Sequence, residues 1–272
     1  MGCDTKSMRI LDCFIFHNEL DLLECRLRHL EGVVDEHILV ESSLTHQGDP
    51  KPLYFRENAE RFASWNITPV AVNIAIEGKD RDSCWTRQAM QREAIREGLK
   101  DAGDDDIILF GDVDEIPGRE LISKDMLLPA AWRMEHRLFA VDWVQPERWK
   151  VATIAARLGD IDSFETLRNS DRNSYPVLDD GWHFSWLGGP DAIKEKARSW
   201  AHTELADMMW DWADQGSLYE NGWSTLASDV RTLSVRMKPA DVTGLPLWIQ
   251  DRKCPESWFR PEKTLTWMKG SR

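Results

Sequence analysis

The chain has 272 residues, of which 42% are hydrophobic and 30% are charged, so it can form a globular protein with a sizeable core. Its 47 acidic and 34 basic residues give a formal net charge of −13, and no basic run follows the pattern of a nucleic-acid binder, which argues against nucleic acid as the principal ligand. The 5 cysteines include no Cys-x-x-Cys pair, which argues against a disulfide framework or a zinc site. No apolar stretch approaches the ~18 residues that span a bilayer, and no signal peptide follows Met1. We therefore expect a soluble, cytoplasmic protein without a membrane span.

Strand and helix patterns alternate through the first half of the chain. Short apolar runs between polar turns predict strands, and leucines at helical spacing predict helices. The expected elements are a strand at Ile10–His17, a helix at about Glu19–Leu30, a strand at Glu36–Glu41, a short helix at about Arg56–Trp65, a strand at Val70–Ile76, a helix at Trp85–Lys100 and a strand at Ile107–Phe110. This alternation indicates an α/β fold of the Rossmann type, with a mostly parallel central sheet flanked by helices.

The second half of the chain is less regular. We expect a helix near Arg119–Met126, antiparallel strands at Ala131–Trp143 and Trp149–Leu158, and a helix from Asp191 to about Ala206. No internal repeat is present. We therefore predict one domain over residues 9–215, a disordered or tag-like N-terminus over 1–8, and a loop-rich C-terminal extension over 216–272 that packs on the same domain.

The strand at Ile107–Phe110 runs into two carboxylates, Asp112 and Asp114. In open α/β sheets, ligands bind beyond the carboxyl ends of parallel strands. Two aspartates at that position offer hard oxygen ligands to Mg²⁺ or Mn²⁺, whose remaining ligands are normally water and substrate phosphate. The alternative is a solvated turn or a pair of helix-capping carboxylates. Asp160 and Asp162 have the same spacing, but no apolar strand precedes them, so we assign them no site.

Several blocks along the chain together resemble glycosyltransferase family 17. They occur in that family's order and are Phe16–Glu24, Val40–Ser42, Pro50–Phe55, Asp112–Pro117 and Gly181–Ser185. The resemblance implies a GT-A-like fold, a UDP-sugar donor, in particular UDP-GlcNAc, and dependence on Mn²⁺ or Mg²⁺. It also implies transfer of the sugar, with inversion, to a glycan, glycoconjugate or other hydroxyl acceptor. The chain lacks the membrane anchor and stem of the family's animal members, so we expect a soluble member.

The resemblance assigns the metal to the two aspartates. Sugar transfer places negative charge on the leaving diphosphate, which a divalent ion stabilises. By resemblance to GT-A enzymes, Asp114 contacts the metal directly and Asp112 contacts the metal or the ribose. His183, in a glycine-flanked aromatic segment, is a further candidate ligand. A structural histidine or a hydrogen-bond donor to the diphosphate is the alternative.

Inversion by a single displacement also needs a carboxylate that takes the proton from the acceptor hydroxyl. The candidates for this catalytic base are Glu204, Asp180, Asp142 and Glu115, of which the first two lead. The sequence does not decide between them, and a surface or capping carboxylate is the alternative for each.

Polar residues at neighbouring strand ends are candidates for donor binding. Asn18 and Glu19 follow the first strand and Glu41 ends the second, although the first two suit helix caps equally well. Arg87 and Arg92 lie on the helix before the Asp112 strand. Either contact with the diphosphate or a solvated helix face explains these arginines.

Trp182 and Trp186 flank His183 and offer aromatic faces to a sugar ring, with core packing as the alternative. Two other classes of function use the same features. A sugar nucleotidyltransferase or phosphohydrolase would use the same metal-binding carboxylates, and a carbohydrate-binding protein would use the tryptophans without turnover.

Overall fold

The computed structural model describes residues 7–149, 152–169, 175–203, 209, 223–226, 233–236 and 238–259. A 7-stranded sheet with the order β10-β6-β9-β4-β1-β2-β3 forms its centre. The strands β3, β2, β1 and β4 run parallel, and β9 runs antiparallel to both of its neighbours. The predicted α/β fold with a mostly parallel central sheet is therefore confirmed. The bounds of these strands are β1 Ile10–Phe16, β2 Glu36–Ser42, β3 Ile67–Val72, β4 Ile107–Asp112, β6 Ala130–Trp132, β9 Ile154–Arg157 and β10 Val177–Leu178.

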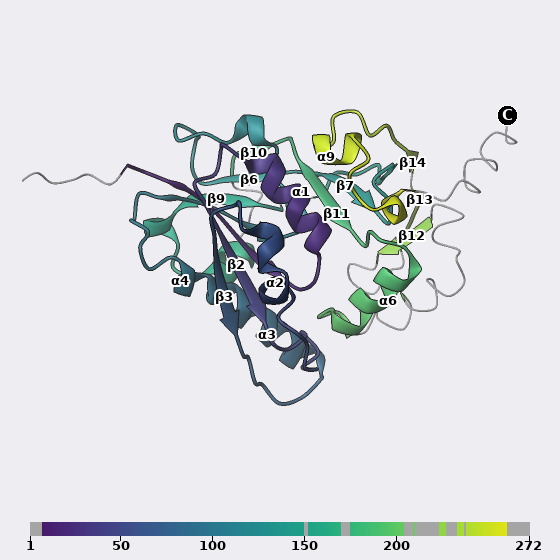
Figure 1. Cartoon of the computed structure of the whole chain (residues 1–272), viewed down its shortest axis with the longest axis horizontal. Helices are drawn as coiled ribbons and strands as arrows, with labels where there is room; N and C mark the ends of the chain where they lie inside the picture. Colours follow the sequence, from purple (N-terminus) through teal and green to yellow (C-terminus); the bar gives the residue numbers. More distant parts are fainter. Residues whose placement is uncertain are drawn as a thin grey trace, which may run out of the picture.

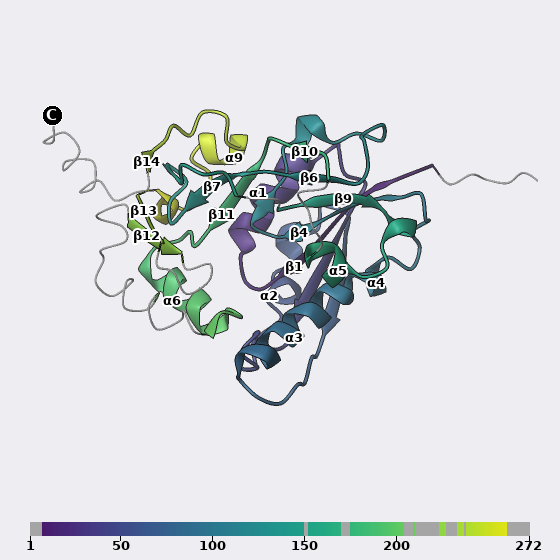
Figure 2. The same cartoon turned by 180° about the vertical axis from the view of Figure 1, so that it is seen from behind.

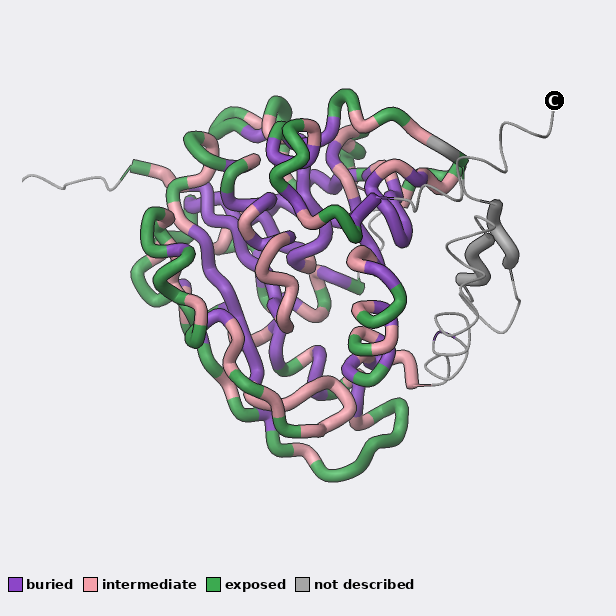
Figure 3. The backbone as a smooth tube through the Cα atoms, turned by 45° about the vertical axis from the view of Figure 1, so that its right-hand side comes forward, coloured by how far each residue is buried: buried purple, intermediate pink, exposed green. Residues whose placement is uncertain are grey.

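Helices cover both faces of this sheet because both faces are apolar. In β1, Leu11 and Ile15 pack on one side with α4 and α5, while Phe14 and Phe16 pack on the other side with α1 and α2. Figure 1 shows α1 in front of the sheet, and Figure 2 shows α3 and α5 in front of the opposite face. Figure 3 shows the buried strands inside a shell of exposed loops. The helices are α1 Leu20–Leu30, α2 Tyr54–Glu57, α3 Arg81–Glu93, α4 Ile95–Gly98 and α5 Phe164–Asn169.

A second, 5-stranded sheet with the order β14-β8-β7-β11-β5 was not predicted from the sequence. Its strands are short and are β5 Glu115–Ile116, β7 Glu135–Leu138, β8 Trp143–Val144, β11 Trp182–Ser185 and β14 Lys238–Pro239. Strand β11 pairs with β5, and His183 lies opposite Glu115 in this pairing. The second sheet thereby brings the segment around His183 beside the carboxyl end of β4. A separate ladder joins β12 (Trp223–Leu226) to β13 (Leu233–Arg236).

The predicted elements of the first half are confirmed, with shifts at their ends, except that the helix expected at about Arg56–Trp65 is divided into the short α2 and a 3₁₀ turn, η1 (Ala59–Phe62). Helix α3 begins at Arg81 because the Asp80 side chain accepts the backbone N–H of Ser83 at 3.0 Å, and a break separates it from α4. Strand β3 begins and ends earlier than predicted. The helix expected near Arg119–Met126 is wrong, since only a 3₁₀ turn, η2 (Arg119–Leu121), forms there.

The long strands predicted in the second half are also wrong in length. The chain leaves the central sheet after β6 and joins the second sheet at β7, so the run at Ala131–Trp143 divides between two sheets, while among the described residues of Trp149–Leu158 only β9 forms. The helix α6 covers Pro190–Ser199 and ends before the predicted Ala206, because Trp200 adopts an extended conformation. The remaining short helices are η3 Leu158–Asp160, α9 Leu247–Gln250 and η5 Glu256–Trp258.

The C-terminal segment around α9 packs on the main body. Leu245, Ile249 and Trp258 are buried in one apolar cluster with Leu22 and Cys25 of α1. Within the described ranges, none of the helices combines the length and the apolar character that crossing a bilayer requires.

Candidate active site

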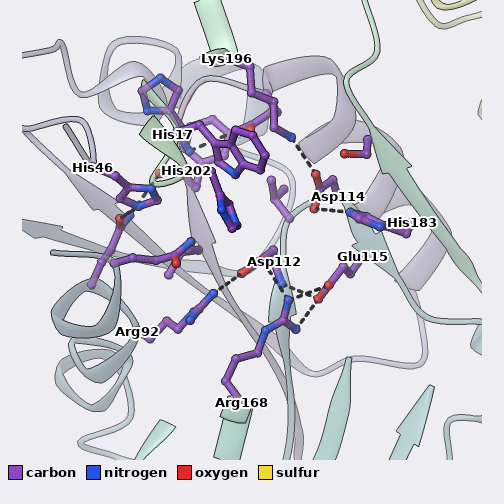
Figure 4. Close-up of a pocket in the computed structure, with 18 of the residues that line it drawn as sticks. His17, His46, Arg92, Asp112, Asp114, Glu115, Arg168, His183, Lys196 and His202 are labelled. Carbon is purple, nitrogen blue, oxygen red and sulfur yellow. Dashed lines mark hydrogen bonds and ion pairs between the residues drawn. The ribbon is translucent and has the colours of Figure 1, made fainter. Parts of the chain in front are cut away.

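The carboxyl end of β4 opens into a cavity of about 340 Å³, which we call the main cavity. Asp112 ends the strand and Asp114 follows two residues later, and both line this cavity. Gly111 permits the arrangement, because a Cβ atom there would lie 2.8 Å from Thr153 Oγ1 and 3.0 Å from Glu115 Oε2. The predicted strand therefore delivers both aspartates to a cavity, as Figure 4 shows.

A buried ion pair supports the turn that carries these aspartates. Arg26 of α1 is fully buried and donates from Nη2 and Nε to both carboxylate oxygens of Asp12, at 2.6 and 2.8 Å. Its Nη1 donates to the backbone carbonyl oxygens of Asp112 and Glu115, at 3.1 and 2.7 Å. Burial alone would raise the pKa of Asp12, but the Arg26 guanidinium outweighs it and lowers this pKa to about 2. Arg26 thus connects the first strand to the turn after β4.

Asp112 faces two arginines. Arg168 of α5 donates from Nη2 to Asp112 Oδ2 at 3.1 Å and contacts both carboxylate oxygens of Glu115 at 2.7 Å. Arg92 lies farther away, with Nη2 at 3.8 Å from Asp112 Oδ1. Burial would raise the pKa of Asp112, but Arg168 and Arg92 hold it below its ordinary value. Within the described residues, no hydrogen bond reaches the buried Asp112 Oδ1.

Asp114 faces a lysine and a histidine. Lys196 of α6 donates to Asp114 Oδ2 at 2.9 Å, and His183 Nε2 lies 3.6 Å from Asp114 Oδ1. Burial acts against the charged forms of both Asp114 and Lys196, but their attraction outweighs it, lowering the pKa of Asp114 and raising that of Lys196. In Figure 4, Lys196 approaches the two aspartates from the top of the view and Arg168 from the bottom.

His183 belongs to a stack of rings on the second sheet. Its ring is parallel to that of His136, with centroids 4.7 Å apart and an interplanar angle of 8°. Trp149 contacts both imidazoles, at centroid distances of 5.0 and 4.6 Å. Burial and the neighbouring His183 lower the pKa of His136 to about 3, so the inner imidazole is neutral at physiological pH.

Two more histidines, His17 and His46, line another part of the main cavity. His46 Nε2 lies 3.1 Å from Gln91 Oε1, and the Gln91 amide donates to the backbone oxygens of Phe16 and Val40. Burial lowers the pKa of His46 to about 4 and that of His17 to about 3. These two imidazoles are therefore neutral near pH 7, each with one donor and one acceptor nitrogen.

Aromatic rings form another wall of the main cavity. Trp200 makes an edge contact with Trp186 at 5.0 Å and a tilted contact with His202 at 4.4 Å, and Trp85 of α3 contacts His202 at 4.8 Å. All 4 of these residues line the main cavity. Beside it lies a second hollow of about 290 Å³, which we call the side cavity and which shares Glu19, Trp186 and Lys196 with the main cavity.

The structure brings half of the predicted site residues to the main cavity. Among the residues nominated from the sequence, those that line it are Glu19, Arg92, Asp112, Asp114, Glu115, His183 and Trp186. Asn18 lines only the side cavity, where its amide donates to Glu195. Glu204 lies outside the described residues.

Other nominated residues have structural contacts elsewhere. Glu41 is buried and accepts from the backbone N–H groups of Tyr54 and Phe55, while Arg87 donates to backbone carbonyls, including that of His46 at 2.9 Å. Trp182 packs on His29, at a centroid distance of 5.1 Å. Asp180 lies against Gly118, and neither Asp180 nor Asp142 lines the main cavity. The structure does not bring these five nominated residues to the site.

Several residues of the cavity were not nominated from the sequence. The most prominent are Arg168, Lys196, His17, His46, His136 and Trp149. Among the described residues, no three or more His, Cys, Asp or Glu side chains gather into a group that could hold a metal ion on its own. A cation here would need ligands from outside the protein.

Comparisons with known proteins agree with the resemblance in the motifs. The profile of glycosyltransferase family 17 matches residues 2–209. The human protein named β-1,4-mannosyl-glycoprotein 4-β-N-acetylglucosaminyltransferase is 24% identical over 222 residues, which cover 68% of this chain and 42% of the human protein. The Rattus norvegicus protein of the same name is also 24% identical, with 41% of its length covered. The chain thus spans well under half the length of these relatives. It belongs to glycosyltransferase family 17.

Proposed function

We propose that the protein is a metal-dependent, inverting glycosyltransferase with a GT-A-like fold. In this proposal it moves N-acetylglucosamine from UDP-GlcNAc to a hydroxyl group of a glycan or glycoconjugate. Family membership and the activity named for the relatives support the reaction class and the sugar. The observation that carries the proposal is the pair Asp112 and Asp114, which lies in a cavity at the carboxyl end of a parallel strand.

The donor set at this pair suits Mn²⁺ or Mg²⁺. Asp112 Oδ1 is buried without a hydrogen bond from the described residues, and the nearest group recorded for Asp114 Oδ1 is His183 at 3.6 Å. Asp112 and Asp114 would hold the ion, and because the described residues form no group of three protein ligands, substrate oxygens and water would complete its ligands. When bound, the ion would act as a Lewis acid and stabilise negative charge on the leaving diphosphate.

The protein's own cations fit the same leaving group. Arg92, Arg168 and Lys196 surround the two aspartates and line the main cavity. Because a diphosphate carries negative charge and the chain as a whole is acidic, local cations are needed to bind it. We assign the diphosphate to this charged end of the cavity.

We assign the uracil base to the part of the cavity that His17 and His46 line. Their neutral imidazoles offer donor and acceptor nitrogens near the ends of β1 and β2. The aromatic wall around Trp186 offers an apolar surface to the transferred sugar. In this arrangement, the nucleotide lies across the carboxyl ends of the parallel strands.

The test is a turnover assay with UDP-GlcNAc and UDP-galactose, with and without Mn²⁺, in the presence of mannosylated glycopeptides. We expect UDP release and a GlcNAc-containing product that depend on the metal. Asp112→Asn should abolish both, whereas Asp160→Asn, which changes an exposed aspartate of the same spacing away from the cavity, should not. Pyrophosphate release from nucleoside triphosphates would instead support a nucleotidyltransferase. Binding of sugars without any turnover would contradict the proposal.

A further inference from the structure

The main cavity and the side cavity meet at three residues, Glu19, Trp186 and Lys196. The side cavity lies between the start of α1, the helix α6 and a C-terminal segment that contributes Ser257 and Trp258. In Figure 1, α6 and this yellow segment lie on the same side of the molecule. These three residues form the boundary between the two cavities, and the Glu19 carboxylate lies at this boundary.

We propose that Glu19 is the catalytic base of the transfer and that the side cavity holds the acceptor sugar. This inference rests on the proposed function, because it assigns the second substrate and the proton transfer of that reaction. Glu19 is the one carboxylate among the described residues that lines both cavities.

The position of the Glu19 carboxylate is fixed by the backbone. Its Oε2 atom accepts the N–H groups of His17 and Asn18 at 3.2 and 3.1 Å. Within the described part of the chain, no hydrogen bond is made to its other oxygen, Oε1. One oxygen thus anchors the group at the end of β1, and the other is available to accept a proton.

The other carboxylates of the main cavity are engaged with cations. Asp112 and Asp114 pair with Arg168 and Lys196, respectively. Glu115 is 1% exposed, and Arg168 donates to both of its oxygens. Both oxygens of Glu115 are thus occupied by the Arg168 guanidinium and do not face an acceptor hydroxyl.

The other carboxylates of the side cavity do not reach the donor. Asp21 pairs with Arg61 at 2.7 Å, and Glu195 accepts from the Asn18 amide. Neither of them lines the main cavity. A base must contact the acceptor hydroxyl while that hydroxyl approaches the donor sugar, and among the described residues this leaves Glu19.

The walls of the side cavity suit a sugar ring. Phe184, Trp186 and Trp258 provide aromatic surface, and Asn18 and Ser257 provide hydrogen-bonding groups. In the proposed step, Glu19 Oε1 takes the proton of an acceptor hydroxyl while the hydroxyl oxygen bonds to the anomeric carbon. The bond from that carbon to the diphosphate breaks, and its electron pair leaves with UDP.

The variant Glu19→Gln tests whether Glu19 acts as a base or only as a structural carboxylate. The glutamine carbonyl can still accept the N–H groups of His17 and Asn18, so the turn is retained, but the side chain can no longer take a proton. With UDP-GlcNAc and a panel of mannosylated glycopeptides and nitrophenyl glycosides, we expect kcat to fall by about 100-fold or more. The Kd for UDP-GlcNAc should remain within about twofold of the wild-type value, since base catalysis acts on the transfer step. Where no acceptor in the panel reacts, donor hydrolysis is the readout, because water also loses a proton.

Two further variants complete the test. Glu24→Gln makes the same chemical change on α1 outside both cavities and should transfer at the wild-type rate. Ser257→Trp places bulk in the side cavity at an exposed position and should raise the acceptor KM by about tenfold or more, with the donor Kd unchanged.

The outcomes distinguish the two proposals. Wild-type protein that neither transfers nor hydrolyses UDP-sugars would overturn the proposed function and this inference together. An active wild type with an equally active Glu19→Gln variant would overturn this inference alone. So would a loss of kcat in Glu195→Gln with Glu19→Gln unaffected, because it would move the base to α6.

Discussion

Two aspartate clusters in this protein contain similar residues but have different roles. In the core cluster of Asp12, Arg26 and His37, Asp12 is 0% exposed and both of its oxygens accept hydrogen bonds. In the cavity cluster, built on Asp112 and Asp114, the side chains are 26% and 11% exposed, and each has one oxygen bound to a cation. A saturated aspartate stabilises the fold, whereas an aspartate with an available oxygen can bind a ligand. From this comparison we infer that Asp112 and Asp114 are suited to bind a ligand and that Asp12 supports the fold around them.

The largest expected effect on stability comes from breaking the core cluster. In Arg26→Met, Asp12 would keep a buried charge without its main partner, and the carbonyls of the turn after β4 would lose a donor. Removing one partner of a buried ion pair typically costs about 3–5 kcal/mol of the free energy of unfolding. Urea unfolding measures this loss. A loss below about 1 kcal/mol would contradict the structural role of the core cluster, because breaking it would then cost no more than breaking an exposed ion pair.

The pH dependence of stability should follow the core cluster. The pKa of Asp12 is about 2 in the folded chain against an ordinary value of 3.8, so its contribution to stability is present above about pH 4 and is lost as the pH falls through 2. The shift corresponds to about 2 kcal/mol. Urea unfolding of the wild type and of Asp12→Asn should therefore show a stability difference that shrinks as the medium is acidified. An equal slope in both proteins would contradict the assignment.

The smallest expected effect on stability comes from breaking the cavity cluster. In Lys196→Met, the buried Asp114 loses its ammonium partner but keeps His183 as a neighbour, so we expect the free energy of unfolding to fall by about 1–2 kcal/mol, less than in Arg26→Met. The Kd for UDP-GlcNAc should nevertheless rise by about tenfold, because a cation next to the diphosphate is lost. Calorimetry of donor binding, set beside urea unfolding of the same variant, checks both parts. A large loss of stability with unchanged donor affinity would contradict the comparison, because the cavity cluster would then support the fold and not bind the donor.

The sequence predicted those features that depend on local patterns. Apolar runs and leucine spacing predicted the strands and helices of the first half, and the run at Ile107–Phe110 located Asp112 and Asp114 at a strand end. The second sheet was missed because its strands are as short as two residues and pair across long stretches of chain. Short strands carry too little periodicity to be read from one sequence.

The partners of the aspartates were missed for a related reason. Arg168 and Lys196 are separated from their aspartates by 56 and 82 residues, and no local pattern distinguishes them from surface cations. The burial of Arg26 could have been predicted from the sequence, because Arg26 is three residues from Leu23 and so lies within the apolar stripe of α1. Asp12 gave the matching signal inside an otherwise buried strand. A charge within an apolar pattern predicts a buried partner, and here that partner supports the site.

The most direct test of the account is the effect of Mn²⁺ on UDP-GlcNAc binding, measured by calorimetry on three proteins. They are the wild type, a double variant Asp112→Asn with Asp114→Asn, and a matched double variant Asp160→Asn with Asp162→Asn, which changes the exposed pair of the same spacing. We predict that Mn²⁺ tightens binding by about tenfold or more in the wild type and the matched control, and not in the first double variant. Donor binding that is independent of the metal in the wild type, or metal-dependent binding that survives in the first double variant, would contradict the account.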